Sequence, residues 1–585
     1  MEKKYYTDER NVQIVIALLK AHGIKKIIAS PGATNITFVA SVQQDPWFEI
    51  YSCVDERSAA YMACGMAEES KEPVVLSCTG ATASRNYMPG LTEAFYRKLP
   101  IIAITSHKGN HLIGHLEAQQ IDRRNPPVDV AMISVAIPTI KDKIDERFCE
   151  IEANKAILTA KQDNGGPVHI NLFTTFCRKY ETKELPPINK INRYTTKDKL
   201  PELSSNETIA VFIGSHKQLE PSYVEAIDKF CSSNNAFVIF DHTSGYQGKF
   251  GIHLGLISSQ KNLQKKVTID TLVHIGEVSG DYYSMMIHPQ RVWRVNEDGA
   301  LRDTFGKLTD VFQMDELDFF KHYSNSSNND SLYNSYRQEY DNMLSKIPEL
   351  PFSNIWIAQQ MAPNMPQGCN LHLGILNTLR SWDFFSTSES ITTNCNVGGF
   401  GIDGNMSSLI GASFVNPQKL YFGIFGDLSF FYDMNSVGNR HIGNNVRILL
   451  INNGRGTEFR NYGNPGSIFG NATDEYISAA RHFGNKSQQL VKHYAEDLGF
   501  RYLTASDKES FLKMVPEFLS PSIGEKPCIF EVFTDSKDES HALRIMLNLI
   551  EADSNPKSFK QSVASTVKSI VGEKAFNITK SIIKK

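Results

Sequence analysis

Short apolar strands that alternate with helices recur along this chain of 585 residues, and this alternation is the feature that most constrains its fold. In the first third, the amphipathic helix Asn11–His22 precedes the apolar run Lys25–Ala29, and the helix Ser58–Glu69 precedes the run Pro73–Ser77. Continuous apolar strands of this length are typical of parallel sheets with helices on both faces. The sequence therefore predicts an α/β fold built from doubly wound parallel sheets.

The predicted strands fall into three groups, which indicates three domains of ordinary size. The other strands are expected at Pro100–Thr105 and Val168–Leu172; at Ile209–Ile213, Ala236–Phe240, Thr271–Ile275 and Val292–Val295; and at Leu420–Phe425, Val446–Ile451 and Cys528–Val532. A stretch rich in Pro and Lys, Leu185–Pro201, and the segment Lys346–Ser353 separate the groups. We expect domains at residues 1–184, 185–350 and 351–554, followed by a basic helical tail at residues 555–585.

The composition excludes several functional classes. A net charge of −3 gives no indication of a nucleic acid or a membrane surface as partner. No apolar run reaches the roughly 18 residues of a membrane span, and the N-terminal MEKKYYTDERN lacks the apolar core of a signal peptide. The nine cysteines form no CxxC pair, so we expect reduced thiols in a cytoplasmic protein.

Two polar motifs follow neighbouring apolar strands of the third domain. Gly426-Asp427 comes directly after Leu420–Phe425, and Asn452–Gly454 comes directly after Val446–Ile451. Taken alone, the motifs could be two ordinary turns. The carboxyl ends of parallel strands meet at one edge of a sheet, however, and α/β folds bind ligands there. Carboxylate and amide oxygens suit Mg²⁺ or Ca²⁺ together with phosphate oxygens, and Ser429 could bond a diphosphate oxygen.

A pair of acidic residues opens a helix in the first domain. A carboxylate in the segment Asp55-Glu56 would lie near Val54, Ala59 and Ala60, in surroundings of low dielectric constant. Burial of this kind raises the pKa of a carboxyl group, which can then share a proton with a ring nitrogen. An acidic pair at a helix start is more often only a cap and a partner of the helix dipole.

Taken together, these motifs resemble the thiamine-diphosphate-dependent enzymes of the acetohydroxyacid synthase and 2-oxo acid decarboxylase type. GD followed about 25 residues later by NN is similar to the family's diphosphate signature, and VDERSAAYMACGMA is similar to its activating-glutamate segment. Ser30–Thr34, Thr79–Ser106 and Gly166–Phe173 resemble further segments of the pyrimidine-binding domain. The resemblance covers about residues 10–550, although the middle domain matches only in its general α/β pattern. The wording DERSA, GIDG and GDLS is that of the menaquinone-pathway SEPHCHC synthase branch.

The resemblance implies a role for individual residues. Glu56 would activate the pyrimidine of the cofactor, whereas its neighbour Asp55 is better interpreted as a helix N-cap. Gln119 would point at the reacting centre, and Ile402 would hold the cofactor in a bent form. The implied metal ligands are the Asp427 carboxylate, the Asn453 side chain and the Arg455 backbone carbonyl. The implied cofactor contacts also include Gly426, Leu428, Ser429 and, more weakly, Met406.

The resemblance also implies the cofactors and the reaction. We expect thiamine diphosphate with Mg²⁺ or another divalent cation, and no FAD, because the flavin-binding elements of the acetohydroxyacid synthase branch are not recognisable in the middle domain. The expected reaction is decarboxylation of pyruvate or 2-oxoglutarate, with transfer of the acyl unit to an acceptor, in a homodimer or homotetramer whose sites lie between subunits. The alternatives are a decarboxylase that releases an aldehyde and a non-catalytic cofactor-binding scaffold, against which the intact Glu56, Asp427 and Asn453 argue.

The chain departs from the SEPHCHC synthase pattern at its substrate-binding arginines. Thr34, Val397 and the pair His107-Lys108 occupy the positions where that branch carries arginine. Arginine holds carboxylates bidentately, and threonine or valine cannot. The departures therefore predict an acceptor that is smaller or less anionic than isochorismate, with Thr34, His107, Lys108 and His115 as candidate substrate contacts.

Overall fold

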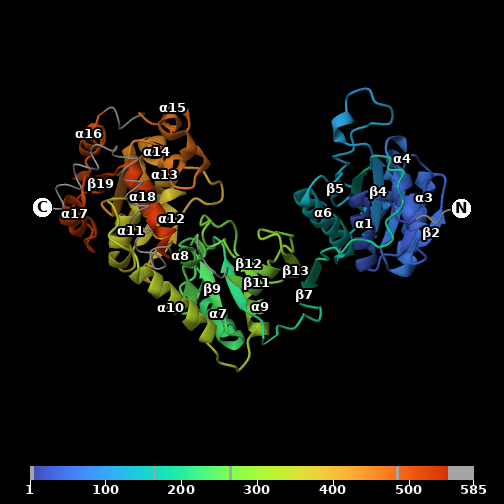
Figure 1. The fold of residues 1–585 in the computed structure, drawn as a ribbon, viewed down its shortest axis with the longest axis horizontal. Helices are drawn as coiled ribbons and strands as arrows, with labels where there is room; N and C mark the ends of the chain where they lie inside the picture. The colour runs from blue at the N-terminus through green and yellow to red at the C-terminus, as the bar shows by residue number, and fades with distance from the viewer. Residues whose placement is uncertain (1–4, 164, 205, 262–266, 482–486, 551–585) are drawn as a thin grey trace. The chain divides into compact units, whose positions relative to one another are not determined.

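The computed structural model contains three sheets, and it places described residues in two compact units (Figure 1). The described residues are 5–163, 165–204, 206–261, 267–481 and 487–550. The basic tail predicted at residues 555–585 lies outside them. The first unit runs to Leu200 and includes Asn296–Gln313, and the second holds Pro201–Val295 and the described residues from Met314 on. The strand pairs described in all three sheets are parallel, which confirms the predicted fold class.

The first sheet has the strand order β2-β1-β3-β4-β6-β5. Its strands are β1 (Lys26–Ala29), β2 (Glu49–Ser52), β3 (Val74–Thr79), β4 (Ile101–His107), β5 (Ser134–Ile137) and β6 (Val168–Phe173). Its helices are α1 (Arg10–Ala21), α2 (Ile36–Val42), α3 (Glu56–Ser70), α4 (Thr82–Asn86), α5 (Met88–Arg97) and α6 (Lys143–Lys161).

Alternate residues of the first sheet pack into two separate cores. Ile27 packs in one hydrophobic cluster with residues of α1 and α6, whereas its neighbour Ile28 packs in another with residues of α3 and α5. Successive side chains of a strand point to opposite faces, so a strand buried on both faces must be apolar throughout. This arrangement explains why these strands appear in the sequence as continuous apolar runs.

Over the strands that lie in the second unit, the middle sheet has the order β10-β9-β8-β11-β12. Its strands are β8 (Ile209–Ile213), β9 (Ala236–Phe240), β10 (Gly251–Ile252), β11 (Thr268–Ile275) and β12 (His288–Val295). The helices that follow or interrupt it are α7 (Pro221–Asn234), α8 (Gly255–Ser258), α9 (Glu316–Tyr323) and α10 (Ser331–Ser345). The strands β7 (Asn192–Thr195) and β13 (Leu308–Gln313) pair in parallel within the first unit.

The third sheet has the order β15-β14-β16-β17-β19-β18, with β16 and β17 at its centre. Its strands are β14 (Asn370–Leu373), β15 (Thr392–Asn394), β16 (Tyr421–Gly426), β17 (Val446–Asn452), β18 (Arg501–Ala505) and β19 (Cys528–Phe533). Its helices are α11 (Asn354–Met361), α12 (Asn377–Trp382), α13 (Asn405–Val415), α14 (Asp427–Tyr432), α15 (Thr473–Tyr476), α16 (Leu490–Asp497), α17 (Lys508–Phe518) and α18 (Ser536–Met546). Among the described residues, no helix has the length and apolarity that a membrane span requires.

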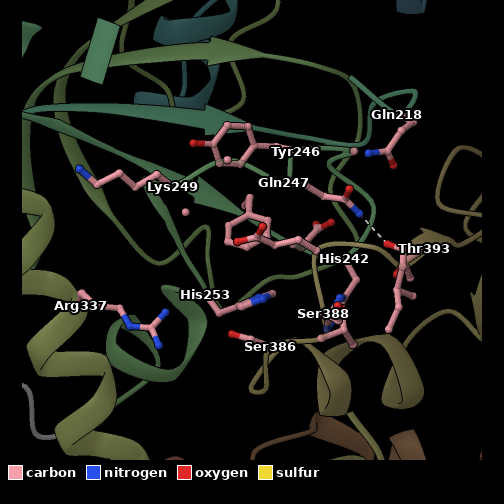
Figure 2. Close-up of a pocket in the computed structure, with 18 of the residues that line it drawn as sticks. Gln218, His242, Tyr246, Gln247, Lys249, His253, Arg337, Ser386, Ser388 and Thr393 are labelled. Carbon is pink, nitrogen blue, oxygen red and sulfur yellow. Dashed lines mark hydrogen bonds between the residues drawn. The ribbon is translucent and has the colours of Figure 1, made fainter. Parts of the chain in front are cut away.

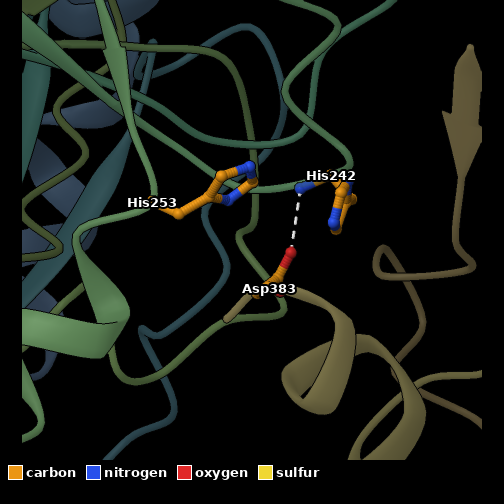
Figure 3. Close-up of side chains that lie close together, drawn as sticks. All are labelled: His242, His253 and Asp383. Atoms are coloured by element: carbon orange, nitrogen blue, oxygen red, sulfur yellow. Dashed lines mark hydrogen bonds between the residues drawn. The ribbon is translucent and has the colours of Figure 1, made fainter. Parts of the chain in front are cut away.

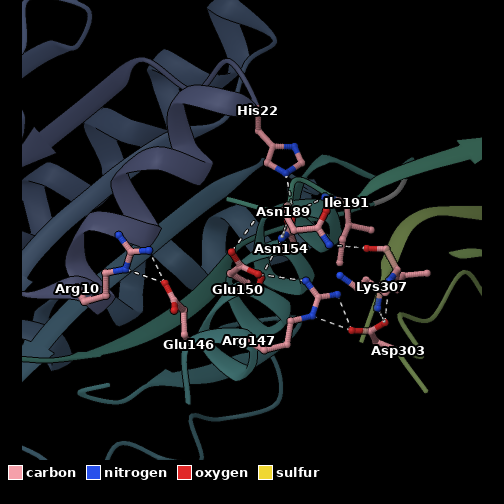
Figure 4. A network of polar contacts seen from close by, with 11 residues as sticks. Arg10, His22, Glu146, Arg147, Glu150, Asn154, Asn189, Ile191, Asp303 and Lys307 are labelled. Carbon is pink, nitrogen blue, oxygen red and sulfur yellow. Dashed lines mark hydrogen bonds and ion pairs between the residues drawn. The ribbon is translucent and has the colours of Figure 1, made fainter. Parts of the chain in front are cut away.

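A polar network ties the returning segment 296–313 to α6 (Figure 4). Arg147 donates from Nε to the Asp303 carboxylate over 2.8 Å and pairs with Glu150 over 3.1 Å. The Asn189 amide donates to the carbonyl of Leu308 over 2.8 Å. Part of the segment expected in a middle domain at residues 185–350 thus belongs to the first compact unit.

Candidate active site

The two polar motifs of the third domain meet at the carboxyl edge of its sheet. β16 and β17 are paired in register, with Gly426 opposite Ile451, so the residues that follow each strand are neighbours. The Asp427 carboxylate accepts hydrogen bonds from the backbone N–H of Leu428 over 2.7 Å, from that of Arg455 over 3.1 Å, and from that of Gly454. Asp427 and the loop after Asn453 therefore form one site, as their spacing predicts.

Among the described residues, no positively charged side chain is bonded to the Asp427 carboxylate. Asp427 is 4% exposed, and burial raises the pKa of its carboxyl group to about 7 in spite of the backbone N–H groups that bond it. A divalent cation supplies the charge that keeps a buried carboxylate ionised. The described hydrogen-bond donors to Asp427 are all neutral backbone groups, so the site is suited to a cation.

The remaining oxygen donors of the site are consistent with a metal and a diphosphate. The Asn453 side-chain oxygen accepts from the Thr457 hydroxyl over 2.7 Å, and the Arg455 carbonyl accepts from the Thr457 N–H over 2.9 Å. Each oxygen keeps a second lone pair for a cation. A Cβ placed on Gly426 would meet nothing within 4 Å, which leaves open space where a ligand can approach the backbone.

The segment around Ile402 is bonded to the same helix that carries Asp427. The Ile402 carbonyl accepts from the Ser429 hydroxyl over 2.7 Å and from the Asn405 amide over 2.8 Å. The Ile402 side chain is only partly buried, as a contact to a cofactor requires. Met406, by contrast, is wholly buried in the core of the third domain, so the structure does not support our assignment of it as a cofactor contact. The physical reason is that α13 turns this position toward the sheet.

In the first unit, the two acidic residues of the DERSA segment have different environments. Asp55 caps α3 and accepts from the N–H of Arg57 over 2.9 Å and of Ser58 over 3.4 Å, which confirms its predicted N-cap role. Glu56 is the first residue of α3, is half-buried, and accepts from the Asn86 amide over 3.1 Å. Only Glu56 is therefore free of a capping role.

The expected apolar enclosure of Glu56 is not present within the described chain. Val54 is 76% exposed, and Ala59 and Ala60 are buried in the core beneath α3 rather than around the carboxylate. The expectation of local burial was wrong because the helix start lies at the surface of the unit. Large apolar side chains are exposed on β2, α3 and α5 of the same unit: Tyr51, Tyr61, Met62 and Tyr96.

The residues expected to contact the substrate differ in their accessibility. Thr34 is buried and donates from its hydroxyl to the carbonyl of Ser106 over 2.6 Å, so it joins its turn to β4. His107 is buried against Phe173, with ring centroids 4.4 Å apart, and burial lowers the pKa of its imidazole to about 3. A neutral imidazole cannot serve as the positive partner of a carboxylate.

The other candidate contacts lie on the loop that follows β4. Lys108 is half-exposed and pairs with Glu117 over 3.5 Å. His115 is exposed, and so is Gln119, whose φ of 63° places it on a turn and not on a helix. These side chains are accessible to a ligand, whereas those of Thr34 and His107 are not.

A buried arginine at the edge of the first sheet was not predicted from the sequence. Arg123 is 6% exposed, and its Nε and Nη1 have no hydrogen-bond partner among the described residues. Burial lowers the pKa of its guanidinium to about 10. Its neighbour in sequence, Arg124, bonds the Asp122 carboxylate over 2.7 Å. A buried arginine without a carboxylate partner is rare and indicates a place for an anion.

Arg123 lies close to the place where an arginine is missing from the SEPHCHC synthase pattern. A Cβ on Gly80 would lie 2.2 Å from Nη1 of Arg123, so the guanidinium packs against the turn after β3. The N–H of Gly80 lies 3.4 Å from the Thr34 hydroxyl. Arg123 and Arg85 also line a cavity of about 30 Å³. The only sequence signal for this site is the pair of arginines in IDRRNPP, which gives no sign of which one is buried.

Comparison with known proteins gives the family of the chain. Residues 10–125 match the family model of the thiamine pyrophosphate enzyme, N-terminal TPP binding domain. The chain thus belongs to the thiamine-pyrophosphate-dependent enzyme family, in the class of transferases and lyases.

Its relatives within that class are named 2-succinyl-5-enolpyruvyl-6-hydroxy-3-cyclohexene-1-carboxylate synthase. The protein from Phocaeicola vulgatus is 30% identical over 562 residues, which cover 92% of this chain and 98% of the relative. That from Bacteroides fragilis is 29% identical over 563 residues, with the same coverage of both chains. That from Flavobacterium psychrophilum is 28% identical over 553 residues, which cover 90% of this chain and 96% of the relative.

Proposed function

We propose that this enzyme is a carboligase, which decarboxylates a 2-oxo acid and transfers the remaining acyl unit to an acceptor. The observation that carries the proposal is the buried Asp427, which has only neutral donors around it and shares its site with the loop after Asn453. Thiamine diphosphate, when bound, supplies the nucleophilic carbon that attacks the 2-oxo acid and the electron sink that accepts the charge when CO₂ leaves.

The residues of the chain would bind the cofactor, orient it and exchange a proton with it. The Asp427 carboxylate, the Asn453 amide oxygen and the Arg455 carbonyl would hold Mg²⁺, and Ser429 and the backbone at Leu428 would contact the diphosphate. Ile402 would support the rings of the cofactor, and Glu56 would share a proton with its pyrimidine. The accessible Gln119 would face the substrate.

We propose a homodimer or homotetramer as the active form, in which a second copy covers the start of α3. The support is the set of exposed large apolar side chains on β2, α3 and α5, in the unit that carries Glu56, since exposed apolar patches mark interaction sites. Such cover would provide the low-dielectric surroundings that Glu56 lacks in the single chain. Its chemical consequence is a carboxyl group that holds a proton near neutral pH.

We propose 2-oxoglutarate as the donor, ahead of pyruvate. The relatives are named for a product that carries a succinyl group, and a succinyl unit is what remains of 2-oxoglutarate after the loss of CO₂. We expect kcat/KM for CO₂ release to be at least about tenfold higher with 2-oxoglutarate, because one bonded charged group contributes roughly 1.5–3 kcal/mol. Release of CO₂ from each acid, measured by coupled assay with a panel of acceptors, checks this.

The same assay separates the proposal from its rivals. A free aldehyde as the main product in the presence of every acceptor would identify a simple decarboxylase. Equal or faster reaction with pyruvate would contradict the donor assignment, and no CO₂ from any 2-oxo acid would indicate a scaffold.

For the acceptor, we propose a molecule with fewer carboxylates than isochorismate. Neither valine nor threonine supplies a charged donor. In the structure, Val397 is buried, and the Thr34 hydroxyl donates to the carbonyl of Ser106. The acceptor panel should therefore include isochorismate alongside smaller 2-enoates and aldehydes. Faster transfer to isochorismate than to every smaller acceptor would overturn this part of the proposal.

Arg123 is proposed to bind a carboxylate of a substrate. Its Nε and Nη1 are buried and have no hydrogen-bond partner among the described residues. A carboxylate could therefore accept charge-assisted hydrogen bonds from the guanidinium without displacing another carboxylate. We expect Arg123→Gln to raise KM for one anionic substrate at least about tenfold, with a smaller change in kcat, because a hydrogen bond to a charged group contributes roughly 1.5–3 kcal/mol. Steady-state kinetics with each substrate varied in turn measure the effect.

The exposed neighbour provides the matched control for this variant. Arg124→Gln removes a guanidinium that bonds Asp122 at the surface and should leave both KM values unchanged. Arg123→Lys should recover part of the lost affinity, because it restores the charge but not the fork. Unaltered KM values in folded Arg123→Gln enzyme would show that the residue serves only packing.

A further inference from the structure

Two histidines and an aspartate converge in the second unit, in a place for which the proposed reaction has no use. Candidate ligand atoms of His242, His253 and Asp383 all lie within 4.8 Å of one another (Figure 3). His242 comes just after β9, His253 just after β10, and Asp383 caps the C-terminal end of α12. All three side chains are buried, with His253 3% and Asp383 2% exposed.

The hydrogen bonds around the cluster leave one polar atom of His253 and one of Asp383 without a partner among the described residues. Nε2 of His242 lies 3.1 Å from the carbonyl of Trp382 and 3.0 Å from that of Phe385, so this nitrogen carries the proton and Nδ1 is the bare acceptor. The backbone N–H of His242 donates to Oδ1 of Asp383 over 3.0 Å. Nδ1 of His253 and Oδ2 of Asp383 have no hydrogen-bond partner within the part of the chain that is described.

The charges of the cluster favour a cation. Both imidazoles are buried, and an imidazole binds a metal ion through the lone pair of its unprotonated nitrogen. The nearby Arg380 pairs with Glu458 over 2.8 Å, and among the described contacts no basic side chain forms an ion pair with Asp383. Buried polar atoms without a partner are costly, and both His253 and Asp383 carry such an atom among the described residues.

We propose that His242, His253 and Asp383 form a binding site for a divalent transition-metal ion, of which Zn²⁺ is the best fit. Two imidazoles and one carboxylate, with a fourth position open, are a known zinc ligand set, and the carbonyl contacts of His242 Nε2 orient its ring as outer-shell partners do. Ligands about 2.0–2.2 Å from Zn²⁺ lie roughly 3.3–3.6 Å apart. The candidate ligand atoms, which lie within 4.8 Å of one another, would have to move closer together to reach that geometry.

The fourth position of such a site has access to a cavity. His242 and His253 both line a cavity of about 180 Å³, together with Tyr246, Lys249 and Arg337 (Figure 2). Water or a small ligand can therefore reach the ion from this side. Because its ligands come from the loops after β9 and β10 and from the end of α12, the ion would link the middle and third sheets of the second unit. This inference does not depend on the proposed function.

The test is the zinc content of the intact enzyme in the presence of its other cofactors. Holoenzyme is saturated with thiamine diphosphate and Mg²⁺, incubated with micromolar Zn²⁺, dialysed, and analysed by inductively coupled plasma mass spectrometry. We expect about one zinc per chain in the wild type, since three protein ligands are present. In His253→Gln and in Asp383→Asn, the affinity for zinc should fall at least about tenfold, with magnesium content unchanged.

Two comparisons separate this site from adventitious binding and from misfolding. His441→Gln removes an exposed histidine of the same unit and should keep the zinc of the wild type. Asp383→Asn retains the acceptor for the His242 N–H, so its melting temperature without zinc should match that of the wild type, and only the rise on adding zinc should disappear. No zinc in the wild type, or equal zinc in all the variants, would overturn the inference.

Discussion

Glu56→Gln is expected to reduce turnover at least about 100-fold while thiamine diphosphate still binds. The substitution keeps the shape of the side chain and its bond to Asn86, but glutamine cannot exchange a proton with the pyrimidine ring. Proton transfer by a positioned side chain contributes roughly 10²–10⁴-fold to a rate, so its loss should appear in kcat and leave the cofactor affinity nearly constant. CO₂ release under saturating cofactor gives kcat, and calorimetric titration gives the affinity.

The adjacent acid is the matched control for this experiment. Asp55→Asn preserves an N-cap side chain at the start of α3 and should retain most of the activity, because asparagine caps helices as well as aspartate does. If Asp55→Asn is inactive and Glu56→Gln is not, the two roles are reversed. Normal kcat in Glu56→Gln would remove the residue from the mechanism altogether.

Asp427→Ala is expected to abolish metal-dependent cofactor binding. The Asp427 carboxylate is both the proposed cation ligand and the acceptor for the N–H groups of Gly454 and Arg455, so its removal loosens the diphosphate loop as well. Changes to outer-shell partners already weaken metal binding about 10–100-fold, and we expect the loss of a direct ligand to reach on the order of 100-fold or more. Calorimetry of thiamine diphosphate binding with and without Mg²⁺ measures it.

An exposed acid in the same domain controls for a general effect of charge. Asp497→Ala, at the end of α16, should bind cofactor and Mg²⁺ as the wild type does. Asp427→Asn keeps an oxygen acceptor for the loop but loses the charge, and it should fold normally and still bind poorly. Undiminished Mg²⁺-dependent binding in Asp427→Asn would mean that the cation is held elsewhere.

Most interior strands of the sheets were predictable from the sequence, whereas the interior strand β14 and several edge strands were not. β8 and β9 match their predicted bounds, and β16 and β17 match within one residue, because a strand buried on both faces must be a continuous apolar run. β2 and β15 lie at sheet edges and have few buried residues. The sequence therefore contains no apolar run that predicts them. Pairing with a neighbour, which is a tertiary interaction, defines these strands.

The candidate site divides in the same way. The sequence alone determined that Asp427 and the loop after Asn453 would meet, since both follow strands of one parallel sheet, and that Asp55 would cap α3. Only the tertiary structure decided that Met406 belongs to the core, that Glu56 lies at the surface, and that Arg123 is buried without a partner.

The convergence of His242, His253 and Asp383 was likewise decided only by the tertiary structure, because it brings together segments about 130–140 residues apart. Periodicity and spacing indicate which residues are close along the chain. In a parallel sheet they also indicate which residues follow the carboxyl ends of neighbouring strands. Burial and contact between distant segments depend on how helices and loops pack against one another. The local sequence does not determine that packing.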